Sequence, residues 1–136
     1  MYLLDTNIIS ETRRGSAAAS KWLEDKVPET LFLSVLTLGE IERGIVKLKL
    51  RDELGSERLE HWKLTLIENY GNRILPVSDE IAMKWGALSF GRTIGVADAL
   101  IGATAFVHGL TMVTRNVKDF EGAGMDLLNP WGHLPN

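Results

Sequence analysis

The stretch Met1-Tyr2-Leu3-Leu4-Asp5-Thr6-Asn7-Ile8-Ile9-Ser10 is an apolar run that ends on a carboxylate and continues into small hydrogen-bonding side chains. The run 2–4 predicts a buried strand, so Asp5 stands where that strand leaves its sheet. In open α/β sheets ligands bind at the carboxyl ends of the strands, which makes Asp5 a candidate for chemistry. An Asx turn or a helix cap formed by Asp5 is the simpler alternative.

Length and composition predict one domain spanning residues 1–136, which is long enough to bury its own core. The chain has no cysteine, which excludes disulfides and fits a reducing cytoplasm. Asp5 interrupts the first apolar run too early for a secretory signal, and no apolar stretch reaches the roughly 18 to 20 residues that span a bilayer. A soluble, cytoplasmic protein without membrane contact is therefore expected.

The formal net charge is −3, so the charge of the whole molecule does not favour a polyanionic partner. A nucleic acid would depend on local cations. Three clusters could supply them, although each also suits an ordinary solvated surface. They are Arg13 with Arg14; Arg43, Lys47, Lys49 and Arg51; and Arg115 with Lys118.

Short apolar runs alternate with longer segments of helical period along the whole chain. Strands are predicted at 2–4, 31–33, 74–77, 111–114 and, more weakly, 125–128. Helices are predicted at 16–25, 34–50, 56–70, 79–89 and 97–108, with Ser16 and Ser34 as N-caps and Gly109 as a left-handed stop. This alternation predicts an α/β fold, a three-layer sandwich in which helices cover both faces of a central parallel sheet.

Three carboxylates fall in positions that the sheet could bring together: Asp5 after the first strand, Glu40 within the helix after the second, and Asp98 at the start of the apolar helix. Each has an ordinary explanation as a turn former, an exposed helical acid or a first-turn acid. Asp98, however, borders a nearly all-apolar helix, where an unpartnered carboxylate is costly. A hard divalent cation is one of the few partners that can hold several acids together.

Five blocks of the sequence resemble one family in order and spacing: 3–11 (LLDTNIISE), 34–44 (SVLTLGEIERG), 97–105 (ADALIGATA), 113–120 (VTRNVKDF) and 127–131 (LLNPW). The family is the PIN-domain ribonucleases, specifically the VapC-type toxins of bacterial toxin–antitoxin pairs. The resemblance covers essentially the whole chain. It implies a PIN-like strand order 3-2-1-4-5, which periodicity alone does not give.

The resemblance also implies roles for individual residues. Asp5, Glu40 and Asp98 match the catalytic acids of the family, and Asp5 and Asp98 would bind Mg²⁺ or Mn²⁺. A fourth, often acidic position is Asn116 here, and Asp119 is the nearest carboxylate that could compensate. The resemblance further makes Thr6 and Asn116 ligand-orienting groups and Arg115 a phosphate contact, whereas Asn7 is interpreted as a turn former.

The function implied is a metal-dependent endoribonuclease toxin that leaves a 5′ phosphate and a 3′ hydroxyl and is neutralised by a cognate VapB-like antitoxin, on a homodimeric toxin. Helices carrying Trp22 and Trp62 are candidate walls of the antitoxin groove, with core packing as the alternative. The segment before Asp98 is shorter than in typical members, which affects the groove more than the acids. Two other functions stay open: a catalytically weak PIN-like module that binds RNA or protein, and a DNA-directed relative of the flap nucleases.

Overall fold

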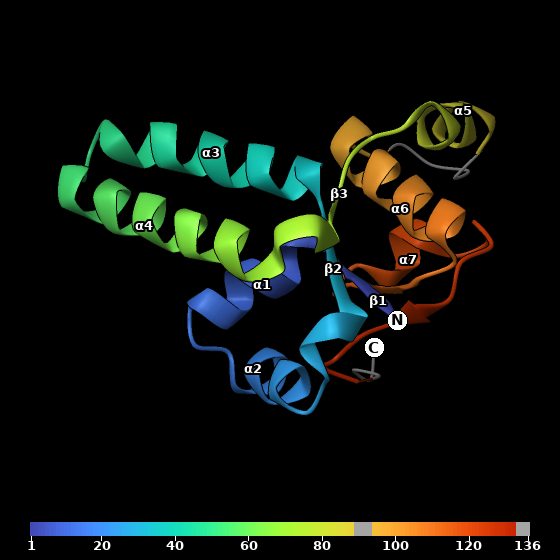
Figure 1. Cartoon of the computed structure of the whole chain (residues 1–136), viewed down its shortest axis with the longest axis horizontal. Helices are drawn as coiled ribbons and strands as arrows, with labels where there is room; N and C mark the ends of the chain where they lie inside the picture. Colours follow the sequence, from blue (N-terminus) through green and yellow to red (C-terminus); the bar gives the residue numbers. More distant parts are fainter. Residues whose placement is uncertain (89–93, 133–136) are drawn as a thin grey trace.

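A five-stranded parallel sheet forms the centre of the computed structural model, which describes residues 1–88 and 94–132 (Figure 1). Its strands are β1 (Tyr2–Leu4), β2 (Leu31–Ser34), β3 (Ile74–Leu75), β4 (Thr111–Val113) and β5 (Leu127–Leu128). They lie in the order β3-β2-β1-β4-β5 and all pair in parallel. The strand order expected from the resemblance is confirmed.

Strand β1 lies between β2 and β4, the point at which the chain changes the side on which it adds strands. Leu4 pairs with Val113, and the Asp5 amide continues the ladder by donating to the Val113 carbonyl at 2.9 Å. Asp5 therefore ends β1 at a switch point between neighbouring strands, where α/β folds place their ligand sites.

The helices cover both faces of the sheet (Figure 1). They are α1 (Thr6–Arg13), α2 (Ala17–Glu24), α3 (Val35–Lys49), α4 (Glu53–Tyr70), α5 (Asp79–Ala87), α6 (Val96–His108) and α7 (Val117–Phe120), with short 3₁₀ turns at Pro28–Thr30 and Gly71–Arg73. Helices α1 to α4 lie on one side of the sheet, where α3 and α4 form a long hairpin. Helices α5, α6 and α7 lie on the other side.

Successive residues of β1 face these two layers, as the pleat of a strand requires. Leu4 packs in one core cluster with Ile8, Ile41 and other residues of α1, α3 and α4. Leu3 packs in the second cluster with Ile101 of α6. Both leucines are fully buried, so the predicted three-layer sandwich is confirmed.

Most predicted elements are present, with shifted ends. Ser16 and Ser34 cap α2 and α3 as expected. Helix α4 begins three residues earlier than predicted because the Asp52 side chain caps it by accepting from the Gly55 amide. The ladders of β3 and β5 are shorter than predicted, and α1 and α7 were not predicted. Helix α5 ends at Ala87, and its predicted end at residue 89 lies outside the described residues, as does most of the connection to α6.

Among residues 1–88 and 94–132, no helix is both long enough and apolar enough to cross a bilayer. Helix α6 buries residues on several sides. It ends at Gly109, which has a left-handed φ of 64° as the sequence predicted.

Replacing Gly109 with Ala should destabilise the fold by about 1 kcal/mol, since a side chain disfavours the left-handed conformation. Gly39→Ala is the matched control, because Gly39 lies within α3 and an added Cβ would meet no atom within 4 Å. Alanine there should stabilise the helix by up to about 1 kcal/mol. Urea unfolding of both variants checks the opposite signs, and two variants with the same sign would contradict them.

Candidate active site

A cavity of about 300 Å³ lies at the carboxyl edge of the sheet and contains the three acids predicted from the sequence. Asp5 comes from the end of β1, Glu40 from α3 and Asp98 from the first turn of α6. Three segments remote in sequence thus meet in one cavity. Its lining residues are Asp5, Thr6, Asn7, Ser10, Glu11, Arg14, Glu40, Asp98 and Asn116.

Asp5 is almost completely buried, with 3% of its surface exposed. Its Oδ1 accepts from the Thr6 amide at 2.8 Å, and its Oδ2 accepts from the Thr114 hydroxyl at 2.8 Å and from Asn7 Nδ2 at 3.2 Å. Burial nevertheless raises the pKa of Asp5 to about 6, and the negative charges of Asp98 and Glu40 add to the rise. The helix-cap alternative is also correct, since Asp5 caps α1, but a cap alone does not require a carboxylate in this acidic setting.

Glu40 is fixed from α1. The Thr6 hydroxyl donates to Glu40 Oε1 at 2.7 Å and also lies 2.9 Å from the hydroxyl of Thr37, which is fully buried one helical turn before Glu40. Glu40 is therefore held toward the cavity and is not a freely solvated helical acid. Thr6 acts here as an orienting group for a carboxylate.

Asp98 completes the set of acids. Its pKa is raised by burial and, after that, by the charges of Glu40 and Asp119. Asp98 in turn raises the pKa of Asp5, so Asp5 and Asp98 each lie in a field of neighbouring negative charge. A cation in the cavity would relieve this repulsion.

The donor set fits a hard divalent ion that keeps part of its water shell. In the part of the chain that the structure describes, no group of three or more Asp, Glu, His or Cys side chains is arranged to hold a metal directly. Magnesium is commonly held by one or two carboxylates plus waters and substrate oxygens. The predicted pair Asp5 and Asp98 matches that mode better than a cage of all three acids does.

The other predicted site residues lie around this cavity. Asn116 lines it, and the Asn116 amide donates to the Thr114 hydroxyl at 3.0 Å. Asp119, on α7, lines a second cavity of about 800 Å³ together with Arg115, Asn116 and Lys118. Asn116 is common to both cavities, so the two are adjacent.

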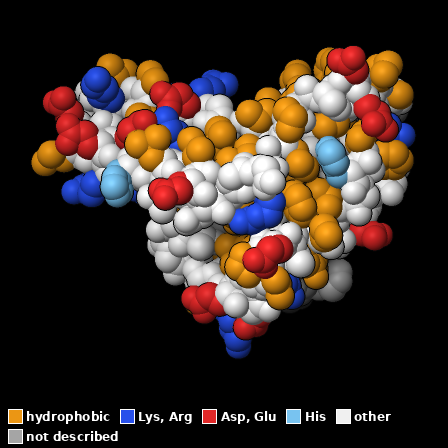
Figure 2. All heavy atoms as spheres, in the orientation of Figure 1, with side chains coloured by type: hydrophobic (Ala, Val, Ile, Leu, Met, Phe, Trp, Pro, Cys, Tyr) orange, Lys and Arg blue, Asp and Glu red, His pale blue; other side chains and the backbone are white. Residues whose placement is uncertain are grey.

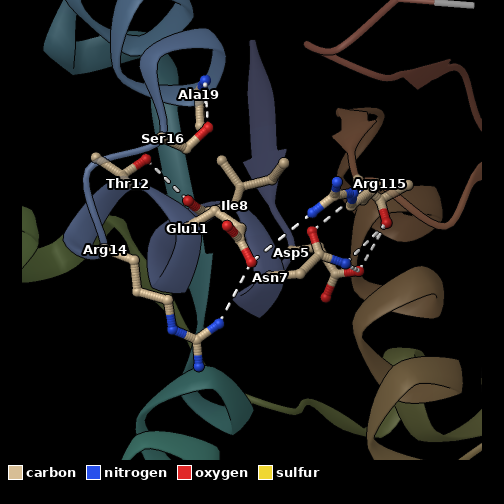
Figure 3. A network of polar contacts seen from close by, with 10 residues as sticks. Asp5, Asn7, Ile8, Glu11, Thr12, Arg14, Ser16, Ala19 and Arg115 are labelled. Carbon is tan, nitrogen blue, oxygen red and sulfur yellow. Dashed lines mark hydrogen bonds and ion pairs between the residues drawn. The ribbon is translucent and has the colours of Figure 1, made fainter. Parts of the chain in front are cut away.

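Two residues of the site, Thr114 and Glu11, had no role predicted from the sequence, and Asn7 does more than form a turn. Asn7 connects Asp5 to the segment after β4: its Nδ2 donates to Asp5, and its Oδ1 accepts from the Arg115 amide at 3.3 Å. Thr114 donates to Asp5, and Glu11 lies beside Arg115, as Figure 3 shows for Glu11. Each has a partner across the β1–β4 junction, which depends on the strand order, and only the contact of Glu11 with Arg14 is local in sequence.

A family model described as "PIN domain" matches residues 2–123. This chain belongs to the PIN-domain family. Relatives of similar length support the assignment: the VapC ribonuclease Y4jK of Sinorhizobium fredii is 34% identical, covering 96% of this chain and 98% of its own length. The toxin FitB of Neisseria gonorrhoeae is 36% identical, covering 96% and 99%.

Solved structures of toxin–antitoxin complexes contain chains with a similar fold. The FitAcB structure from Neisseria gonorrhoeae superposes with a TM-score of 0.85 at 32% identity, covering 98% of this PIN domain and 100% of that chain. VapBC2 from Rickettsia felis, bound to a promoter DNA fragment, gives 0.74 at 27% identity, covering 94% and 97%. The resemblance to VapC-type toxins and the PIN-like fold are both confirmed.

Proposed function

We propose that this PIN domain is a divalent-cation-dependent endoribonuclease and the toxin of a toxin–antitoxin pair. One observation carries the proposal: Asp5, Glu40 and Asp98, from three separate segments, line one cavity at the switch point of the sheet. The relatives named as VapC ribonuclease and toxin agree with it. Burying mutually repelling acids costs free energy, and carboxylates with pKa values perturbed in this way cluster at functional sites.

Asp5 and Asp98 would hold Mg²⁺ or Mn²⁺, with Glu40 contributing through water. When bound, such an ion polarises the phosphodiester and lowers the pKa of a coordinated water. The side chains of this chain do the remaining work: Thr114 and the Thr6 amide keep Asp5 oriented, and Thr6 keeps Glu40 directed at the cavity.

In the hydrolysis we propose, water oxygen bonds to phosphorus while the bond to the 3′ oxygen breaks. The attacking water gives up one proton to solvent and the 3′ oxygen takes one up from solvent, so the products carry a 5′ phosphate and a 3′ hydroxyl. Glu40 would orient the attacking water, and Asn116, at the border of the two cavities, would orient water or a phosphate oxygen. Arg115 would contact phosphate, and Asp119, whose charge already acts on Asp98, would add to the negative potential that attracts the cation.

An antitoxin is the proposed partner. A cavity of about 270 Å³ shares Thr6, Ser10, Arg14 and Glu40 with the acid cavity and extends to Leu59 and Trp62. Both tryptophans are partly buried and pack against the core, as the alternative expected; Trp62 also borders a groove that leads to the acids, whereas Trp22 packs edge-on against Tyr2. We propose that a segment of a VapB-like antitoxin occupies this groove, that the toxin is a homodimer, and that RNA is the substrate.

Removal of the metal tests this function. Purified protein incubated with cellular RNA and Mn²⁺ or Mg²⁺ should give discrete cuts that disappear with EDTA and return when excess Mn²⁺ is added. Mapping the product ends should show 5′ phosphates. Cutting that persists in EDTA would contradict the metal role, and RNA binding without cutting at any metal concentration would favour the binding module.

A further inference from the structure

Two arginines flank the acid cavity, and one carboxylate connects them. Glu11, on α1, lies between Arg14 and Arg115, with its Oε1 3.3 Å from an Arg14 guanidinium nitrogen and 3.8 Å from an Arg115 guanidinium nitrogen (Figure 3). Glu11 and Arg14 line the acid cavity, and Arg115 lines the larger cavity beside it. The two cations thus lie near the acids without pairing with them.

Arg115 is positioned from three directions. Glu11 approaches its guanidinium group, the Trp131 ring lies 4.7 Å from the guanidinium carbon, and the Arg115 amide donates to Asn7 Oδ1. Asn7 also donates to Asp5, so the backbone of Arg115 is tied to the acid at the centre of the site. Arg115 still has 47% of its side chain exposed, which leaves it accessible to a ligand.

An RNA ligand needs such local cations. The net charge of the chain is −3, and side chains of both signs are interspersed on the face shown in Figure 2. An arginine has five donors in a planar fork that suits phosphate, but a free side chain loses rotamer entropy when it is fixed. A neighbouring carboxylate that already restricts the arginine reduces that loss.

We propose that Arg14 and Arg115 form a phosphate-binding subsite for the RNA phosphates on either side of the one that is cut, and that Glu11 is its positioning residue. The inference rests on the proposed ribonuclease function and adds the way in which the substrate is held. Glu11 uses one nitrogen of each guanidinium group, and each fork has further donors for phosphate.

The expected change in RNA affinity on removing the Glu11 charge is opposite in sign to that expected from net charge. If only net charge mattered, removing a carboxylate beside bound RNA would tighten binding, because one repulsive charge is lost. If Glu11 positions the arginines, Glu11→Gln should weaken RNA binding, because both arginines lose the group that orients them. The sign of the change therefore separates the two explanations.

The test measures binding of a fluorescein-labelled single-stranded oligoribonucleotide by anisotropy, in an Asp5→Asn background that does not cut. Glu11→Gln should raise Kd about threefold to fivefold. Arg115→Gln should raise Kd and lower the slope of log Kd against log salt by about 0.7. Adding Glu11→Gln to the double variant Arg14→Gln, Arg115→Gln should weaken binding no further, since Glu11 acts through these two arginines.

Glu29→Gln is the matched control. Glu29 is exposed in the 3₁₀ turn before β2, at the amino end of that strand and away from the acids. Glu29→Gln changes the net charge by the same amount as Glu11→Gln. It should leave Kd the same or slightly lower. In the cutting-competent protein, the effect of Glu11→Gln is expected in KM rather than in the rate at saturating RNA.

The outcomes separate this inference from the function it rests on. If wild type cuts RNA and Glu11→Gln binds as tightly as wild type or more tightly, the subsite is wrong and the ribonuclease stands. A loss confined to the rate at saturating RNA also overturns the positioning role. If wild type does not cut but Glu11→Gln weakens RNA binding and Glu29→Gln does not, the subsite stands and the ribonuclease proposal fails.

Discussion

Replacing Asp5 with Asn should lower the rate of RNA cleavage at saturating Mn²⁺ by at least about a hundredfold. Asp5 is the most buried acid of the cavity, and both of its oxygens are oriented by hydrogen bonds. An amide keeps the size of the side chain but removes the charge that a divalent ion requires. The measurement is single-turnover cleavage of one RNA that wild type cuts at a defined site.

The matched control is Asp25→Asn, which makes the same carboxylate-to-amide change at the exposed end of α2. It should cut at the wild-type rate. Circular dichroism of both variants checks that the fold is intact. If Asp5→Asn keeps more than about a tenth of the wild-type rate while remaining folded, Asp5 is not a ligand of the catalytic ion.

Two of the three acids could be singled out from the sequence because each stands at a recognisable boundary. Asp5 ends an apolar run, and Asp98 opens an apolar helix. Asp5 and Asp98 therefore both lie at the border of the core. That they share one cavity with Glu40 depends on β1 lying between β2 and β4, and this order came from the family resemblance.

The supporting contacts could not be predicted in the same way. Asn7 reaches Arg115 across 108 positions of sequence, and Thr114 reaches Asp5 across 109. Such polar pairs have no periodicity and depend on the register of β1 against β4. Glu11 is only three residues from Arg14, but its second partner, Arg115, is again set by that register. Local signals therefore indicated Asp5 and Asp98, the family resemblance indicated Thr6, and neither indicated the contacts that depend on the register of β1 against β4.

The same buried acid that serves cleavage should weaken the metal-free fold, and the effect should depend on pH. The pKa of Asp5 is about 6 in the folded protein, against 3.8 as its ordinary value. A raised folded-state pKa means that stability present below about pH 4 is lost as pH rises toward 6. Above that range the deficit is constant, at roughly 3 kcal/mol, since each pKa unit corresponds to about 1.4 kcal/mol.

Asp5→Asn should therefore be more stable than wild type in EDTA at neutral pH, and the difference should be small near pH 4 and reach about 2–3 kcal/mol by pH 7. Urea unfolding at several pH values measures this difference directly. The shape of the curve is the stronger test, because an amide also changes the hydrogen bonds to Asn7 and Thr114 by an amount that pH does not alter.

Divalent ions should remove most of the difference in stability between wild type and Asp5→Asn. An ion that binds only the folded state at a hundred times its Kd stabilises it by about 2.7 kcal/mol, which would offset most of the Asp5 deficit in wild type. Mn²⁺ should therefore raise the Tm of wild type and leave that of Asp5→Asn nearly unchanged. Equal shifts in both proteins would place the ion away from Asp5, and a difference in EDTA that does not vary with pH would show that Asp5 is not destabilised by its charge.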